Sequence, residues 1–149
     1  TPIFFNNYRK LLCIFSAFQL IKILTAESQK NLKIYGLIEN FYILLKKANW
    51  IRNYIFWELE LFKVIGYDLE LKNLVKKELI NNEVKYLVKS TKENKIVPNF
   101  LIDNNQDFLN DEILIDGLRL VGDYLEKSIL RPNNINYPLS RLRFLNTFK

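Results

Sequence analysis

Apolar residues recur every three or four positions along most of this chain, and that spacing places them on one face of an α-helix. The pattern predicts five helices, over residues 8–25, 28–47, 50–65, 111–130 and 138–148. In the first of them, apolar side chains cover more than half of the circumference, which predicts burial on several sides. We therefore expect a mainly α fold, a multi-helix bundle of about five helices in a single domain over residues 1–149.

The period changes between residues 67 and 98, where apolar and other side chains alternate as in a half-buried strand. The inward set is Val84, Tyr86 and Val88, and the outward set is Lys85, Leu87 and Lys89. Asn94 suits the positive φ of a tight turn, and Pro98, which has no N–H to donate, would end the returning strand. This stretch predicts a small β-hairpin inserted between helices.

Residues with a preferred place at helix ends mark several of the predicted boundaries. Asn49 suits the N-cap of the third helix, and Gly66 suits the left-handed conformation that ends it. Pro132 ends the fourth helix, because the residue before a proline avoids the helical region. Pro138 suits the first turn of the closing helix.

Much of the chemistry that enzymes use is missing from the sequence. It contains no histidine, the usual general base near neutral pH, and no glycine-rich phosphate-binding loop. Cys13 is the only cysteine, so it has no disulfide partner, and its apolar neighbours predict a small core residue. Glu58 and Glu60 point to different sides of a helix, and we expect one solvated charge and one salt bridge. The sequence predicts no enzymatic activity.

Charge and hydropathy favour a cytoplasmic protein with polyanionic partners. The chain has 22 Lys and Arg against 16 Asp and Glu, a net charge of +6, and such an excess favours polyanions without proving them. No signal peptide is legible. The most apolar stretch, residues 11–24, is interrupted by Ser16, Gln19 and Lys22, whereas a membrane span needs about 20 consecutive apolar residues. A buried helix is the better interpretation.

Four segments carry more specific motifs. WELELFKVIGYDLEL at 57–71 has an aromatic-Glu-Leu start and a Gly-Tyr stop, and STKENKIV at 90–97 is a lysine-rich hairpin followed by Pro98. IDGLRLVGDYLE at 115–126 and the proline-led LSRLR at 139–143 complete the set. In this order the motifs resemble the helical C-terminal part of RecO, a bacterial mediator of DNA repair and recombination. The third is similar to a helix of alphaproteobacterial members, and the first fifty residues agree in helical pattern alone.

Two departures from the RecO pattern affect what the resemblance implies. Many members hold zinc with Cys-x-x-Cys pairs after the first motif, but the first such position is Leu74 here. Since a thiolate zinc site needs four ligands, we expect no zinc site. The N-terminal oligonucleotide-binding (OB) domain of the family is absent from these 149 residues. We therefore expect exposed apolar surface where that domain would dock.

The resemblance implies a non-catalytic role in the RecF, RecO and RecR pathway, without a cofactor. Members bind RecR and single-stranded DNA, assist RecA loading and anneal strands, which implies a nucleoid-associated cytoplasmic protein. Single-stranded DNA binding should be weak without the OB domain. The helical part is expected to receive the acidic C-terminal tail of single-strand-binding protein. That tail ends in an aromatic residue and a carboxylate, so its receptor needs an apolar slot beside an arginine or lysine.

Individual basic residues are candidates for these contacts. Arg52 and Arg119 are the candidates for partner binding, with an ion pair of Arg119 to Asp116 or Asp123 as the equally weighted alternative. Side chains that would neutralise phosphates, or else form solvated helix ends, are Arg9, Lys10, Lys46, Lys47, Arg131, Arg141 and Arg143. The main competing hypothesis is a generic helical protein-interaction module with no nucleic-acid role. A peripheral membrane protein and an enzyme rank below it.

Overall fold

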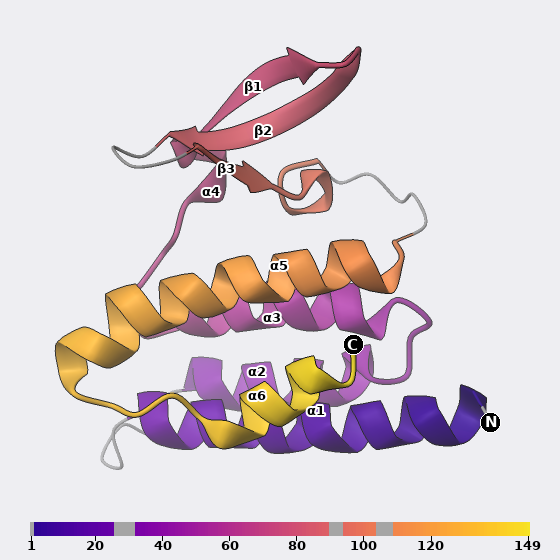
Figure 1. Ribbon diagram of the computed structural model, residues 1–149. Helices are drawn as coiled ribbons and strands as arrows, with labels where there is room; N and C mark the ends of the chain where they lie inside the picture. The colour runs from indigo at the N-terminus through magenta and orange to yellow at the C-terminus, as the bar shows by residue number, and fades with distance from the viewer. Residues whose placement is uncertain (1, 26–31, 90–93, 104–108) are drawn as a thin grey trace.

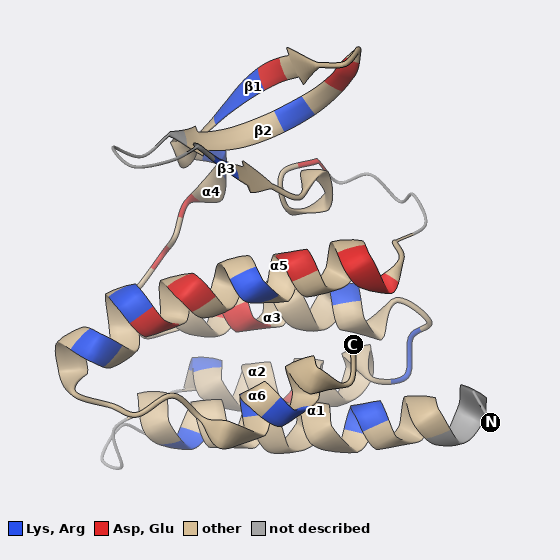
Figure 2. Ribbon diagram, viewed as in Figure 1, with Lys and Arg blue, Asp and Glu red and all other residues tan. Residues whose placement is uncertain are grey.

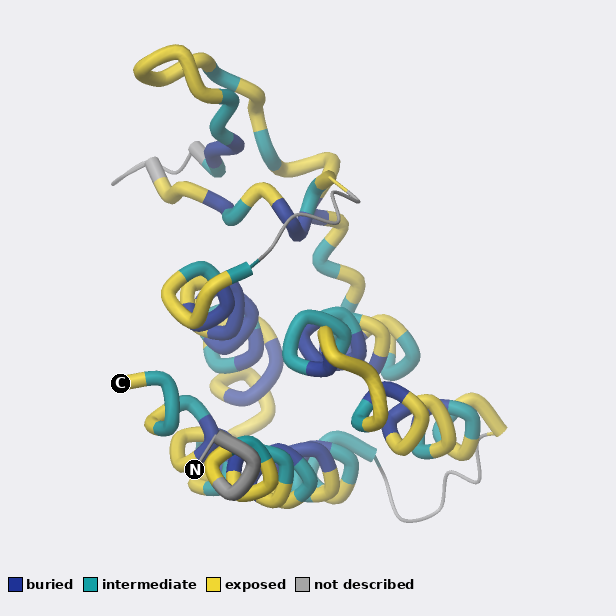
Figure 3. Tube along the Cα trace, turned by 90° about the vertical axis from the view of Figure 1, so that its right-hand side faces the viewer, coloured by how far each residue is buried: buried dark blue, intermediate teal, exposed yellow. Residues whose placement is uncertain are grey.

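The computed structural model describes residues 2–25, 32–89, 94–103 and 109–149 (Figure 1). This part of the chain is mainly helical and carries one small antiparallel sheet, so the predicted fold class is confirmed. Figures 1 and 3 show three levels, with the sheet at one end of the molecule and two layers of helices below it.

The two helical layers are built from elements that lie far apart in the sequence. One layer holds α1 (Pro2–Leu24), α2 (Leu32–Leu44) and α6 (Leu139–Asn146), and the other holds α3 (Trp50–Val64) and α5 (Asp111–Tyr124). After α5 the chain continues as a π-helical turn, Leu125–Leu130, and a 3-10 turn, Arg131–Asn133. Regular α-helix therefore ends at Tyr124, well before Pro132. Arg131 keeps helical dihedral angles, with φ of −58° and ψ of −48°, so the prediction that Pro132 holds the preceding residue out of the helical region is wrong.

The sheet has three strands, one more than the predicted hairpin. A single helical turn, α4 (Leu71–Leu74), leads into β1 (Val75–Ile80), which pairs with β2 (Glu83–Lys89), and β2 pairs with β3 (Asn94–Val97). Asn81 and Asn82, with φ of 53° and 65°, join β1 to β2 in the conformation of a two-residue hairpin turn. Asn94 belongs to β3 and not to a turn, which corrects the prediction. The connection at 90–93 lies outside the described residues.

The residue predicted to end α3 has the expected conformation, whereas the residue predicted to begin it forms no cap. Gly66 has a φ of 102°, its N–H donates to the Lys63 carbonyl at 3.0 Å, and the Tyr67 N–H donates to the Phe62 carbonyl at 2.7 Å. This is a complete Schellman motif. Asn49 does precede α3, but its side chain accepts from the Asn53 side chain and caps no backbone N–H.

The core lies between the two helical layers, where buried residues gather in Figure 3. Aromatic rings dominate it: Trp57 lies 5.2 Å from Phe41 and 5.6 Å from Tyr54, centroid to centroid, and Tyr54 lies 5.5 Å from Phe144. The Trp57 indole also donates to the Leu37 carbonyl at 2.8 Å. These contacts join α2, α3 and α6 around one centre.

Helix α1 is less buried than its apolar composition predicts. Cys13, Ala17 and Leu20 are buried, so the expected core role of Cys13 is confirmed. The opposite side of the helix carries large apolar side chains that remain exposed, among them Leu11 and Phe15. The prediction of burial on several sides is therefore wrong for α1, because only one side of it faces α3 and α6.

Candidate functional site

Arg141 lies at the centre of a buried polar network. Its Nε donates to Glu58 Oε2 at 2.9 Å and its Nη2 donates to Glu58 Oε1 at 2.7 Å, and both side chains are fully buried. The Leu118 carbonyl and the Tyr137 hydroxyl accept the remaining bonds, at 2.9 and 2.6 Å. The prediction that Arg141 contacts DNA phosphates is wrong, because its guanidinium reaches no solvent. Glu60 is exposed, so Glu58 is the salt-bridged carboxylate of the pair.

The network sets the protonation of its neighbours. Burial alone would lower the pKa of Arg141, but the adjacent Glu58 carboxylate reverses this and holds the pKa above its usual value. Burial raises the pKa of the Tyr54 hydroxyl well above its ordinary value, and the Glu58 charge raises it further. The same two causes, in the same order, raise the pKa of the Cys13 thiol. Tyrosine and thiol are therefore both held neutral, so neither is primed for nucleophilic chemistry.

Arg9 is also held inside the structure. Its guanidinium donates to both carboxylate oxygens of Asp111, at 3.2 and 2.7 Å, and to the Thr147 side chain and carbonyl. It also lies 4.1 Å above the Phe148 ring. These contacts tie α1 to the start of α5 and to the end of the chain. The predicted role of Arg9 in phosphate binding is therefore wrong for this conformation.

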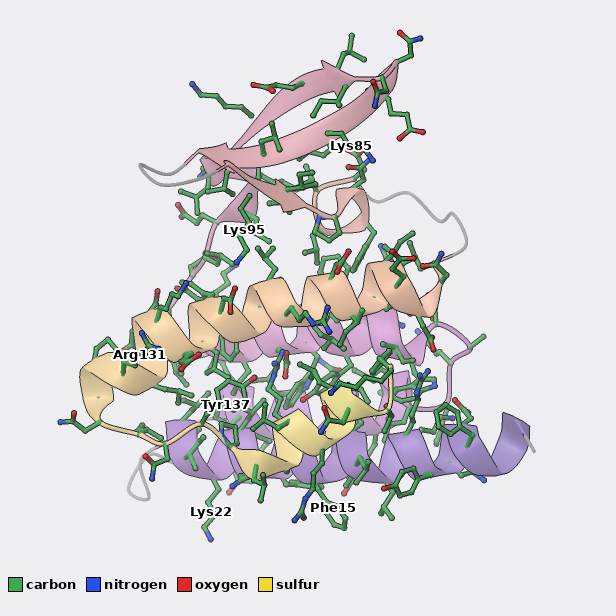
Figure 4. All side chains as sticks on the ribbon, viewed as in Figure 1. Phe15, Lys22, Lys85, Lys95, Arg131 and Tyr137 are labelled. Carbon is green, nitrogen blue, oxygen red and sulfur yellow. The ribbon has the colours of Figure 1, made fainter. Side chains whose placement is uncertain are left out.

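The other candidates for DNA binding do not form one surface. Lys46 and Lys47 are exposed in the loop between α2 and α3, while Arg131 lies at the opposite end of the molecule (Figures 2 and 4). Arg131 pairs with Glu126 at 3.2 Å, and Lys10 lies 5.8 Å from the Trp50 ring. Arg143 is exposed on α6. Their roles stay predictions.

A cleft of about 740 Å³ separates the sheet from α5. Residues of β3, of the 3-10 turn η1 (Asn99–Leu101) and of α5 line it, and its apolar part consists of Ile96, Val97, Phe100, Leu109, Ile113 and Leu120. Lys85 and Lys95 reach it from the sheet (Figure 4), and Arg119 reaches it from α5. The arrangement is an apolar slot with basic side chains around it.

Among the described residues, Arg119 is the cation of this cleft that has no acidic partner. Lys95 forms an ion pair with Asp123, and Lys85 lies 3.2 Å from Glu83, so both lysines have acidic partners. The Arg119 guanidinium is exposed, and in the described part of the chain it makes no ion pair with Asp116 or Asp123. The alternative in which an intrahelical ion pair occupies Arg119 is therefore not seen.

The third motif contains two glycines, and the first of them, Gly117, shapes the cleft. A Cβ on Gly117 would lie 2.7 Å from Phe100 Cζ, so only glycine lets the Phe100 ring rest on α5 without displacement. Gly122 plays a similar part deeper in the bundle, because a Cβ there would lie 2.5 Å from Arg141 Nη1. Both glycines are explained by close approach, one beneath the cleft and one beside the buried network.

Arg52 does not join Arg119 in the cleft. Its guanidinium lies 4.9 Å from the Phe56 ring, and its buried Nε has no hydrogen-bond partner among the residues that the structure describes. The structure thus brings only one of the two predicted partner-binding residues to this site. Sequence reasoning missed Lys85 and Lys95, because alternation placed Lys85 on a solvent-facing side of its strand. The lysine-rich second motif is the signal that could have identified Lys95.

Comparisons with protein-family models, with curated proteins and with solved structures give no match to this chain. Among the described residues, no group of three or more His, Cys, Asp and Glu side chains is placed to hold a metal ion. No helix in the same part of the chain is long and apolar enough to cross a membrane.

Proposed function

We propose that this chain is a non-catalytic module of the RecO type, acting in DNA repair and recombination by binding partner proteins and DNA. Two observations support the proposal. The four RecO-like motifs occur in order between Trp57 and Phe144. Arg119, which belongs to the third motif, is the unpaired cation beside the apolar cleft in the described structure, and this second observation carries the proposal.

The chemistry of the cleft fits the end of an acidic peptide. A volume of about 740 Å³ is within the usual range for small-ligand sites, and Ile96 and Ile113, which are not fully buried, offer apolar contact to an aromatic ring. A terminal carboxylate beside that ring would accept paired hydrogen bonds from Arg119. We propose the C-terminal tail of single-strand-binding protein as this ligand.

The test is a titration of a labelled acidic peptide ending in Phe against the whole chain. Arg119→Ala should weaken binding about 10- to 100-fold, because a hydrogen bond to a charged group contributes about 1.5–3 kcal/mol. Arg143→Ala, which removes another exposed arginine, should leave the affinity unchanged. Asp116→Asn should strengthen binding, because Asp116 places a negative charge on the same cleft.

Two outcomes would contradict the peptide site. One is equal affinity of the wild type and Arg119→Ala. The other is equal affinity for the peptide and for its C-terminal amide, because the amide lacks the carboxylate that Arg119 is proposed to bind.

A second titration, with single-stranded DNA at two salt concentrations, separates the RecO-type function from its main competitor. The exposed cations Lys46, Lys47 and Arg143 should give weak, sequence-independent binding that falls as salt rises. A generic protein-interaction module would bind a peptide but no DNA. The scattered positions of the exposed cations, and the burial of Arg9 and Arg141, are the observations that favour this competitor.

A further inference from the structure

Helix α1 carries a solvent-facing stripe of large apolar side chains, on the side away from the core. We call Tyr8, Leu11, Phe15 and Phe18 the α1 seam; their exposed fractions are 54, 46, 53 and 38%. Phe15 and Lys22 point away from the bundle on the same side in Figure 4. The described residues leave roughly half of each of these side chains open to solvent, although the Phe18 ring also packs against Phe41 and Tyr42 of α2.

The spacing of the seam is that of a helix-pairing surface. Steps of three, four and three residues separate its members, and Lys22 follows after a further four. This alternation of three and four is the heptad pattern with which one helix packs along another. The positions that flank the seam on α1 are uncharged: Asn7, Ile14, Gln19 and Ile21. A partner helix therefore needs no charged residues beside its own apolar stripe.

The seam is self-complementary. Positions 8 and 18, and positions 11 and 15, lie symmetrically about residue 13, so reversing the direction of the helix superposes the pattern on itself. In an antiparallel pair Phe18 of one copy would lie against Tyr8 of the other, and Leu11 against Phe15. An interface between two copies related by a two-fold axis requires this property, because the same surface patch of each copy contacts that of the other.

The charges of α1 select the antiparallel direction. Arg9 is buried against Asp111, and Lys10 lies against Trp50, so Lys22 is the one cation in line with the seam. In a parallel pair the two Lys22 side chains would meet. In the antiparallel pair they lie at opposite ends, roughly 27 Å apart along the axis, which is beyond the screening length at physiological salt.

The exposed area suits a weak dimer. Tyr42 of α2 extends the seam, because its ring centroid lies 6.2 Å from that of Phe18. If each of these five large side chains has a surface of about 200 Å², their exposed fractions correspond to roughly 480 Å² of exposed surface per copy. Two copies would bury about 1,000 Å² with their rims, the lower end of specific interfaces. We propose that α1 pairs with α1 of a second copy of this chain, antiparallel and centred near residue 13.

Other occupants fit the seam less well. A nucleic acid needs several cations along its path, and a membrane surface favours a helix rich in lysine and arginine. The seam has only Lys22 in line with it. The dimer is independent of the proposed function, because α5 and β3, which line the cleft beside Arg119, lie on the far side of the bundle from α1 (Figure 1).

Sedimentation of the whole chain from low to high micromolar concentration tests the dimer. The wild type should show a monomer–dimer equilibrium with a micromolar dissociation constant. Phe15→Glu should weaken association at least 10-fold, and Leu79→Glu, which changes an exposed apolar residue on β1, should leave it unchanged. Circular dichroism should show both variants folded, because both side chains are exposed.

Cross-linking tests the direction of the pair. A mixture of Leu11→Cys and Phe15→Cys copies should be joined by a short bismaleimide faster than either variant alone, and the buried Cys13 of the wild type serves as the background control. A wild type that stays monomeric throughout, or a Phe15→Glu variant that dimerises as well as the wild type, would overturn the proposal. Preferential cross-linking of two Leu11→Cys copies to each other would overturn the antiparallel direction. If Phe15→Glu lost DNA binding but kept the molecular mass that the wild type shows in sedimentation, the seam would be a nucleic-acid surface and the dimer proposal would be wrong.

Discussion

Replacing Arg141 by methionine removes one half of a fully buried ion pair and leaves the other half in place. The Glu58 carboxylate would lose both of its bonds to Arg141, at 2.9 and 2.7 Å, inside a core of aromatic rings. Removing one partner of such a pair typically costs about 3–5 kcal/mol, because the remaining charge is buried without compensation. For a chain of this length, 1 kcal/mol corresponds to about 2–4 °C in Tm, so we expect a loss of roughly 10 °C.

Urea denaturation followed by circular dichroism measures the effect, with two matched controls. Arg143→Met, on the same helix but exposed, should change the free energy of unfolding by no more than about 0.5 kcal/mol. The double variant Glu58→Met with Arg141→Met should be more stable than Arg141→Met alone, since no buried charge remains.

A loss below about 1 kcal/mol in Arg141→Met would refute the burial argument. So would an equal loss in Arg143→Met, because the effect would then belong to helix α6 and not to the ion pair.

Further predictions concern the cleft, the buried tyrosine and the exposed seam. Gly117→Ala should destabilise the chain by about 1–3 kcal/mol in urea, because its Cβ would displace Phe100; Gly36→Ala, with nothing within 4 Å, should be neutral or stabilising. Burial raises the pKa of Tyr54, so the folded chain keeps this hydroxyl neutral while the unfolded chain ionises it near pH 10. The free energy of unfolding should therefore fall as the pH rises past about 10, by up to about 1.4 kcal/mol per pH unit for this group, and fall less steeply in Tyr54→Phe. An equal slope in both chains would contradict this. Finally, at a protein concentration well below the dissociation constant of the proposed dimer, Phe15→Glu should reduce the binding of a dye that reports apolar patches, which measures the exposure of the seam in the monomer.

The helices could be predicted because their causes are local. Apolar residues at spacings of three and four, and Gly66 in its left-handed conformation, act over a few neighbours in the sequence. Strand β1 was missed because its burial does not alternate: Leu79 and Ile80 are both exposed, and pairing with β2 holds the strand in place. The Asn81-Asn82 pair between the two strands was the local signal for that hairpin.

The candidate site could be predicted only in part, because its geometry depends on contacts between distant residues. Glu58 and Arg141 are 83 residues apart, and no local pattern indicates that they meet. The third motif correctly drew attention to Arg119, but the freedom of its guanidinium depends on Lys95, which reaches across from the sheet and pairs with Asp123. The exposure of Phe15 likewise follows from which side of α1 the other helices cover.

The most direct test of the proposed function uses DNA coated with single-strand-binding protein. The whole chain is added to single-stranded DNA carrying either the intact protein or one that lacks its acidic C-terminal tail, and the bound chain is measured at physiological salt. The proposal predicts retention on the intact complex, much weaker retention on the tail-less complex, and loss of the difference in Arg119→Ala. Equal retention on both complexes, or on neither, would contradict it.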